Sequence, residues 1–318
     1  MMIKAILFDL YGTLISGQER HFLKQVSHYH IRQLLEGRTV SKLGTLVLNL
    51  KQKLMTTDLS TQAIPHELLS MFFLSPDEQL SDIEREFRNA LLTESQATHL
   101  FSGVKTILSF FKRRGYAIGV VSNVSTYHKE PFFRLGLDRF VDVVVFSCDI
   151  GYAKPHPEMY LNACKQLEVK PDEVVFVGDS YNMDVKMPLS LGMKAIHISK
   201  SRRYRHTIDN ITEMGLMILD DDIYNIKHLI NDTKPVADRK VILQTFTLLE
   251  DQDDQESITY SCSGSHYGEE QKFYLKRYLD PSSLYSRQAE YDHLTGGGDS
   301  SSIPITIASE FFLLIPKE

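Results

Sequence analysis

The chain has 318 residues, of which 42% are hydrophobic and 24% are charged. This composition is typical of globular proteins and excludes a disordered or fibrous chain. The 35 Lys and Arg residues against 41 Asp and Glu give a net charge of −6, which argues against nonspecific nucleic-acid binding because that binding needs a cationic face.

The cysteine count and the hydropathy of the chain indicate the cellular compartment in which the protein is expected. Three scattered cysteines predict neither a disulfide framework nor a zinc site, so we expect a reducing, cytoplasmic environment. The N-terminus runs directly into a strand-like segment, so no cleaved signal is expected. No apolar stretch approaches the roughly 20 residues that a membrane span needs, so no membrane association is expected.

The first element is predicted at residues 3–8, a nearly continuous apolar run that is typical of a strand buried on both faces of a parallel sheet. From about residue 16 to 99 the apolar residues recur at helical spacing, and Pro65 and Pro76 are each placed to begin a helix. This segment is therefore predicted as an inserted helical layer.

Helix-like and strand-like segments alternate from about residue 100 to 235. Helices are predicted at 104–111 and 157–167, and strands at 117–121, 141–146, 173–177, 194–198 and 216–219. Strands joined by helices of this length imply βαβ crossovers. The predicted fold class is therefore α/β, with a doubly wound parallel sheet and helices on both of its faces.

The alternation stops near residue 235. Strand-like segments follow at 241–249, 273–278 and 303–315 without intervening helices, which predicts a β-rich C-terminal extension. The expected domains are a core of residues 1–15 and 100–235, a helical cap of 16–99, and a C-terminal module of 236–318 whose role the sequence does not assign. This module is a candidate surface for a protein partner.

Residues that could take part in catalysis or ligand binding follow the first two core strands. In an open parallel sheet, such side chains meet at the carboxyl ends of the strands. Asp9 can act there as a covalent nucleophile, and Gly12 lets the backbone approach an anion closely. Ser122 and Asn123 supply a hydroxyl and backbone N–H groups that can bind a phosphoryl oxygen. Taken singly, each is also typical of a turn or a helix cap.

Two further signals come later in the chain. Pro155 and Pro157 fix the backbone beside Lys154, which can hold its ammonium near transferred charge. Asp179 and Asp184 lie at a predicted strand-to-helix turn, and carboxylate oxygens are the ligands that Mg²⁺ prefers. Singly, a solvated lysine and helix-capping acids are the simpler explanations.

In this order, each after a predicted strand, the four motifs resemble the haloacid dehalogenase superfamily over about residues 1–15 and 100–235. The helical segment 16–99 resembles the cap that this superfamily inserts after its first motif, and the C-terminal module is not covered. The resemblance implies a Rossmann-like core and a hydrolase.

The resemblance also implies a role for each motif. Asp9 would be the nucleophile, Ser122 would bind the phosphoryl group, and Lys154 would neutralise charge on the nucleophile and the intermediate. Asp184 would orient Lys154 or support the metal shell. The Mg²⁺ ligands would be Asp9, Asp179 and the backbone carbonyl of Tyr11, with Asp184 beside them.

The first motif departs from the phosphatase pattern. Phosphatases of this superfamily usually carry a second Asp two positions after the nucleophile, which donates a proton to the leaving oxygen, and this chain has Tyr11 there. An Asp-x-Tyr-Gly-Thr motif resembles the 2-haloacid dehalogenase branch, where halide leaves without a proton. Tyrosine, with an ordinary pKa of about 10, is a poor base near neutral pH. Gly178-Asp179 instead resembles the metal-dependent phosphatase form.

We therefore expect an enzyme, a Mg²⁺-dependent phosphohydrolase that acts on a small phosphate ester or acyl phosphate through an aspartyl-phosphate at Asp9. The metal-ligating acids weigh most, because buried carboxylates beside a nucleophile are costly without a cation. Two alternatives stay open: a metal-independent 2-haloacid dehalogenase, and a catalytically weak regulatory protein. Chelation separates the first from the phosphatase, and Asp9→Asn, which would leave a regulatory effect intact, separates the second.

Overall fold

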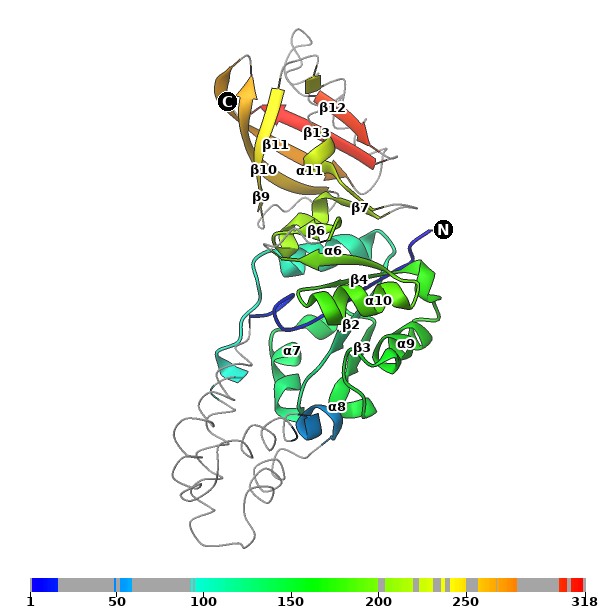
Figure 1. Cartoon of the computed structure of the whole chain (residues 1–318). Helices are drawn as coiled ribbons and strands as arrows, with labels where there is room; N and C mark the ends of the chain where they lie inside the picture. Colours follow the sequence, from blue (N-terminus) through cyan, green and yellow to red (C-terminus); the bar gives the residue numbers. More distant parts are fainter. Residues whose placement is uncertain are drawn as a thin grey trace, which may run out of the picture. The chain divides into compact units, whose positions relative to one another are not determined.

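The computed structural model describes residues 2–16, 49, 52–58, 93, 95–199, 204–219, 223–230, 236–237, 241–249, 257–266, 268–278, 303–307 and 310–316 (Figure 1). The predicted helical cap at 16–99 lies largely outside these residues. The chain forms two compact units, one of Met1–Lys4, Ser102–Tyr116 and Ile198–Glu318, the other of Ala5–Phe101 and Ala117–His197. The predicted boundary after residue 235 lies within the first unit, and the three-part division stays a prediction.

A parallel sheet organises the predicted core. Its strands are β1 (Ala5–Phe8), β2 (Ala117–Ser122), β3 (Val143–Phe146), β4 (Val174–Gly178), β5 (Lys194–Ile198) and β6 (Thr207–Ile208), in the order β3-β2-β1-β4-β5-β6. The pairs β1–β2, β1–β4, β2–β3 and β4–β5 are all parallel. This arrangement confirms the predicted α/β class with a Rossmann-like parallel sheet.

Apolar side chains on both faces of the central strands explain why they form a buried sheet. All four residues of β1 are fully buried, as a strand covered on two sides requires. Helix α9 (Pro157–Gln166) contributes Met159 and Tyr160 to a cluster that also contains Leu7 and Phe176. The position of α9 matters for the site, because the helix begins three residues after Lys154.

Short helices connect the other strands of this unit. They are η2 (Thr126–Lys129), α7 (Glu130–Arg134), η3 (Leu137–Arg139), α8 (Ser147–Ile150), η4 (Pro171–Glu173), η5 (Tyr181–Lys186) and α10 (Met187–Ser190). The segment η5 is a π-helix. Isolated π-helical turns are rare and frequently occur at functional sites.

The strand order reverses direction between β1 and β4. From β1 the chain proceeds outward through β2 and β3, and from β4 it proceeds the other way through β5. Ligands of open α/β sheets bind outside the carboxyl ends of the strands at such a switch point. The fold thus places the residues that follow Phe8 and Gly178 side by side at the expected ligand edge.

The other unit contains α6 (Val104–Arg113) and the C-terminal extension. Its further elements are η6 (Ile211–Leu216), β7 (Met217–Leu219), β8 (Ile223–Asn225), α11 (Ile226–Leu229), β9 (Val241–Leu249), β10 (Ser257–His266), β11 (Glu269–Tyr278), β12 (Ile303–Ile307) and β13 (Glu310–Pro316). Strands β9 to β13 form an antiparallel sheet in the order β12-β13-β11-β10-β9, which confirms the predicted β-rich extension.

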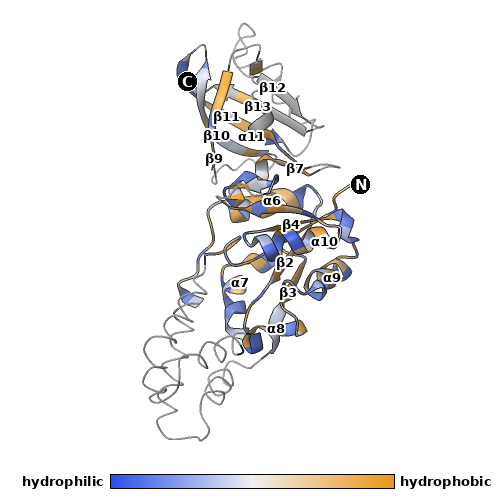
Figure 2. Cartoon of the chain, viewed as in Figure 1, coloured by the Kyte–Doolittle hydropathy of each residue, from blue (hydrophilic) through white to orange (hydrophobic). Residues whose placement is uncertain are grey.

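Helix α6 and η6 pack against this antiparallel sheet. The helix is amphipathic, with both hydrophobic and hydrophilic residues along its length (Figure 2), and it buries Phe110 among others. The guanidinium of Arg277 lies 5.1 Å from the Phe110 ring centroid and donates hydrogen bonds to the carbonyls of Gly215 and Met217 at 2.9 and 2.8 Å. The Tyr260 hydroxyl donates to a carbonyl of η6 at 2.6 Å. Buried side chains of the antiparallel sheet therefore hydrogen-bond to the backbone of η6 and β7.

Crossing a bilayer requires a helix that is both long and apolar. Within the described ranges, no helix combines these two properties.

Candidate active site

The predicted site residues lie where the parallel strands end. Asp9 follows β1, Ser122 is the last residue of β2, and Asp179 follows β4. The Asp9 N–H donates to the carbonyl of Val177 at 2.9 Å, which extends the β1–β4 pairing by one residue. The backbone that carries the Asp9 carboxylate is therefore fixed by the sheet.

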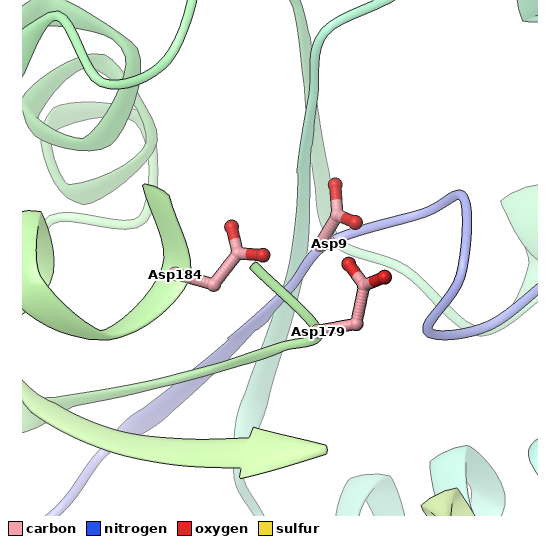
Figure 3. A group of neighbouring side chains, drawn as sticks. All are labelled: Asp9, Asp179 and Asp184. Atoms are coloured by element: carbon pink, nitrogen blue, oxygen red, sulfur yellow. The ribbon is translucent and has the colours of Figure 1, made fainter. Parts of the chain in front are cut away.

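Three carboxylates meet at this edge. Asp9, Asp179 and Asp184 each offer an oxygen, and these oxygens lie within 4.8 Å of one another. Figure 3 shows the three side chains converging, Asp9 from the end of β1, Asp179 from the end of β4 and Asp184 from η5. Residues far apart in the chain thus form one acidic cluster.

The ammonium of Lys154 lies inside the cluster. Its Nζ donates to Oδ1 of Asp9 at 2.6 Å and to Oδ1 of Asp184 at 2.8 Å, and only 2% of the side chain is exposed. The other oxygen of Asp184 accepts the Ser180 N–H at 2.9 Å. Both oxygens of Asp184 are engaged, so this carboxylate holds Lys154 in place.

Two glycines allow the carboxylates to approach the backbone. Gly12 has φ +87°, in the left-handed region, and a Cβ there would lie 2.5 Å from Oδ2 of Asp179. At Gly178 a Cβ would lie 2.4 Å from Cγ of Asp184. The anionic group that approaches Gly12 in this structure is therefore the Asp179 carboxylate.

The electrostatics of the cluster follow from burial and crowding. Desolvation raises the pKa of Asp9 to about 7, although the Lys154 ammonium opposes the shift. Desolvation, followed by repulsion from Asp184, also raises the pKa of Asp179. For Lys154, desolvation favours the neutral form, but attraction to Asp184 and Asp9 outweighs it and raises the pKa of the ammonium. The lysine thus stays charged, while Asp9 and Asp179 resist full ionisation.

The donor set suits a hard divalent cation. It consists only of carboxylate oxygens, which is the ligand type of Mg²⁺, and its three carboxylates face one ammonium. Among the described residues, Asp179 forms no ion pair with a cationic side chain, although Asp9 and Asp184 both do. The cluster therefore has excess negative charge on the Asp179 side, where a cation would relieve it.

The remaining predicted residues make contacts that the sequence did not indicate. The Tyr11 hydroxyl donates to the carbonyl of His128 at 2.9 Å, which ties the first motif to η2. The Asn123 side chain bonds to the backbone of Lys154 at both ends of its amide. Ser122 is buried at the end of the strand beside β1. The catalytic and binding roles of these residues stay predictions.

Sequence reasoning missed two polar residues that support the cluster. His197, near the end of β5, is buried, and its Nε2 donates to the backbone carbonyl of Asp179 at 3.0 Å. The Tyr160 hydroxyl, on α9, donates to the carbonyl of Met183, which precedes Asp184. A histidine inside the otherwise apolar run Ala195-Ile196-His197-Ile198 was the available signal for the first.

Known proteins resemble the chain over the same region. The family model for haloacid dehalogenase-like hydrolases matches residues 3–192. A relative from Bacillus anthracis (strain A0248), pyrophosphatase PpaX, is 28% identical over 234 residues, covering 70% of this chain and 98% of its own. A second pyrophosphatase PpaX, from Bacillus mycoides (strain KBAB4), is 28% identical over 211 residues, covering 64% of this chain and 88% of its own.

Solved structures also align with the chain. A HAD phosphatase from Thermococcus onnurineus aligns with a TM-score of 0.48 and 24% identity, covering 67% of this chain and 96% of that one. The family model alone spans more than half of the chain, and the matched residues include Asp9, Lys154, Asp179 and Asp184. The chain therefore belongs to the haloacid dehalogenase-like hydrolase family.

Proposed function

We propose that the protein is a Mg²⁺-dependent phosphohydrolase that cleaves a small phosphate ester or acyl phosphate through an aspartyl-phosphate at Asp9. The observation that carries this proposal is the convergence of three carboxylates around the ammonium of Lys154 at the switch point of the sheet. The PpaX relatives support the phosphohydrolase class, and they add pyrophosphate to the substrates to be tested.

The reaction would proceed in two steps at Asp9. An oxygen of the Asp9 carboxylate attacks phosphorus, the bond from phosphorus to the leaving oxygen breaks, and the leaving group departs as an anion. Water then hydrolyses the acyl phosphate, which restores the carboxylate and releases phosphate. Lys154 holds Asp9 in place and offsets the negative charge that accumulates. The Ser122 hydroxyl would bind a phosphoryl oxygen.

Mg²⁺ would be held by Asp9, Asp179 and the backbone carbonyl of Tyr11, with Asp184 in support. When bound, the ion would screen the negative charge of the phosphoryl oxygens from the attacking carboxylate. Asp184 contributes mainly through Lys154, because both of its oxygens are already engaged by Lys154 and the Ser180 N–H.

The side chain at position 11 would set the leaving-group preference. The Tyr11 hydroxyl already donates to His128, so it is committed as a donor away from a leaving oxygen. Without a proton donor at this position, leaving groups of low pKa are favoured, such as phenolates, carboxylates and phosphate. We therefore expect aryl phosphates, acyl phosphates and pyrophosphate to be cleaved faster than alkyl phosphates of equal fit.

The deciding experiment is a phosphate-release screen over these substrate classes, with Mg²⁺ and with EDTA. The wild type should release phosphate only with the metal, and Asp9→Asn should abolish release. Asp138→Asn, a change of an exposed aspartate in η3, is the matched control and should leave the rate unchanged. Equal turnover of phenyl and alkyl phosphates would refute the leaving-group argument, and turnover by Asp9→Asn would refute the nucleophile.

Tyr11 also favours a second candidate, a 2-haloacid dehalogenase. In that reaction Asp9 displaces halide from carbon to give an ester, which water then cleaves. Halide release from 2-chloropropionate would persist in EDTA, whereas the phosphatase reaction would stop. The acidic cluster makes this the weaker candidate, because a metal-independent reaction leaves the negative charge of Asp179 without a bound cation to offset it.

A further inference from the structure

The side chain of Asn123 bonds to one residue at two points. Its Nδ2 donates to the carbonyl of Lys154 at 2.9 Å, and its Oδ1 accepts the Lys154 N–H at 2.6 Å. Because a carbonyl can only accept and an N–H can only donate, these partners fix which end of the amide is which. The side-chain amide therefore pairs with the Lys154 backbone as a neighbouring β-strand would, although the two residues are 31 positions apart.

Lys154 needs such an anchor. It lies in the turn between α8 and α9, outside any regular element, and its side chain must span the distance to Asp9, which follows β1. A lysine side chain has many rotamers, so its ammonium is held at one point only if the backbone that carries it is fixed. The two hydrogen bonds from Asn123 supply that fixed point.

A second hydrogen bond fixes the segment that carries Asp184, the other ion-pair partner of the Lys154 ammonium. The Tyr160 hydroxyl donates to the carbonyl of Met183 at 2.5 Å, in the π-helix that carries Asp184. Nδ2 of Asn123 also lies 3.7 Å from the sulfur of Met183. Asn123 thus contacts both the turn that holds Lys154 and the residue before Asp184.

We propose that Asn123 is a positioning residue, whose amide holds Lys154 between Asp9 and Asp184 instead of binding substrate. The inference rests on the proposed function, because it assigns Asn123 to the same reaction. It differs from the role expected from sequence, in which Asn123 contacts the substrate. Both amide atoms are engaged by the protein in the structure, which leaves its effect on the reaction to pass through Lys154.

A double-mutant cycle with 4-nitrophenyl phosphate tests this assignment. Asn123→Ala should lower kcat about 10- to 100-fold and change KM by less than about threefold, because a misplaced catalytic group slows the chemical step. In the Lys154→Met background, Asn123→Ala should cost less than about threefold more, since its target is already absent. Asn162→Ala, which removes a half-exposed amide of α9, is the control and should match wild type.

Two results of this cycle would overturn the proposal. A loss that persists in full in the Lys154→Met background, or a rise in KM that accounts for the loss of kcat/KM, would make Asn123 a substrate ligand. Neither result affects the proposed function, which fails only if Asp9→Asn keeps its turnover.

Chemical labelling provides a measurement that needs no turnover. Acetylation of Lys154 by acetic anhydride, quantified by mass spectrometry, should be slow in the wild type and faster in Asn123→Ala, while labelling of the exposed Lys165 stays constant. Unchanged labelling of Lys154 would overturn the proposal. If Asn123→Ala does not fold, Asn123→Asp replaces it. This variant keeps the oxygen that accepts the Lys154 N–H and loses the donor, so its kcat should also fall, and a wild-type kcat would overturn the proposal.

Discussion

The ammonium of Lys154 lies 2.6 Å from Oδ1 of Asp9, although the two residues are 145 positions apart in the chain. A second ion pair, to Asp184 at 2.8 Å, holds the same nitrogen. The proposed nucleophile is therefore bonded to a cation before any substrate arrives. This pairing offsets part of the cost of burying Asp9, and it directs one carboxylate oxygen to a fixed point.

Lys154→Met should remove that charge with little change in volume. We expect turnover to fall about 10²- to 10³-fold, as is typical when one group that stabilises developing negative charge is lost. Thermal unfolding of the metal-free variant should also shift to lower temperature, because two buried carboxylates lose their partner. Lys165→Met, on the exposed face of α9, is the control, and equal effects of the two substitutions would contradict the assignment.

Gly12→Ala tests the approach of Asp179 to the first motif. The new Cβ would lie 2.5 Å from Oδ2 of Asp179, so the carboxylate must move and Mg²⁺ affinity should fall. Gly115→Ala is a matched control, because φ at Gly115 is +83° and no atom lies within 4 Å of a Cβ there. Both variants should lose about 1–2 kcal/mol of stability from the left-handed backbone, but only Gly12→Ala should lose metal affinity in calorimetry. Equal affinities would contradict the collision.

Metal binding should depend on pH through Asp9. Burial raises the pKa of Asp9 to about 7 in the metal-free protein, so lowering the pH from 8 to 6 protonates a carboxyl that the cation needs in ionised form. The apparent Kd for Mg²⁺ should therefore be about tenfold weaker at pH 6 than at pH 8. At pH 7 about half a proton should be released per ion, measurable by calorimetry in buffers of different ionisation enthalpy. A Kd that does not vary with pH would exclude this coupling.

The sequence predicted the core strands well and the C-terminal sheet only in part. Continuous apolar runs placed β2 and β4 within one residue of their bounds. Strand β10 was missed although its buried Ile258, Tyr260 and Cys262 alternate with polar residues, because serines such as Ser261 and Ser263 are also typical of loops. The run 303–315 was predicted as one strand and is the pair β12 and β13, because Ala308-Ser309 lacks the residues that mark a hairpin turn.

The candidate site, too, was predictable from the sequence only in part. The sequence indicated that Asp9, Lys154 and Asp179 would meet, because Asp9 and Asp179 directly follow strands of one parallel sheet, Lys154 comes in the connection after a third, and such strands end at one edge. It did not indicate that Asn123 bonds to the backbone of Lys154, or that His197 bonds to that of Asp179. Those contacts depend on how the fold brings a side chain of one segment to the loop backbone of another, and this has no periodic signature in the chain.

Arg277 should be a major determinant of stability in the unit that contains the antiparallel sheet. Its guanidinium is buried and donates to two carbonyls, so Arg277→Met leaves those carbonyls without these donors and should lower the free energy of unfolding by about 2–4 kcal/mol. Arg114 also lies over the Phe110 ring, at 5.5 Å, but it is half-exposed, and Arg114→Met should cost less than about 1 kcal/mol. Denaturant unfolding measures both, and similar costs would contradict a stabilising role for the buried carbonyl contacts.

Tyr11→Asp should change which leaving groups the enzyme accepts. A carboxyl two positions after Asp9 can donate a proton to a leaving oxygen, so cleavage of alkyl phosphates should rise relative to phenyl phosphate. Tyr11→Phe is the matched control: it removes only the hydroxyl that donates to His128, and it should leave the alkyl-to-aryl ratio of kcat/KM unchanged. If both variants shift the ratio equally, the preference comes from the position of η2 and not from the missing acid. If neither shifts it, another group of the chain protonates the leaving oxygen, and the missing acid at position 11 does not cause the preference for leaving groups of low pKa.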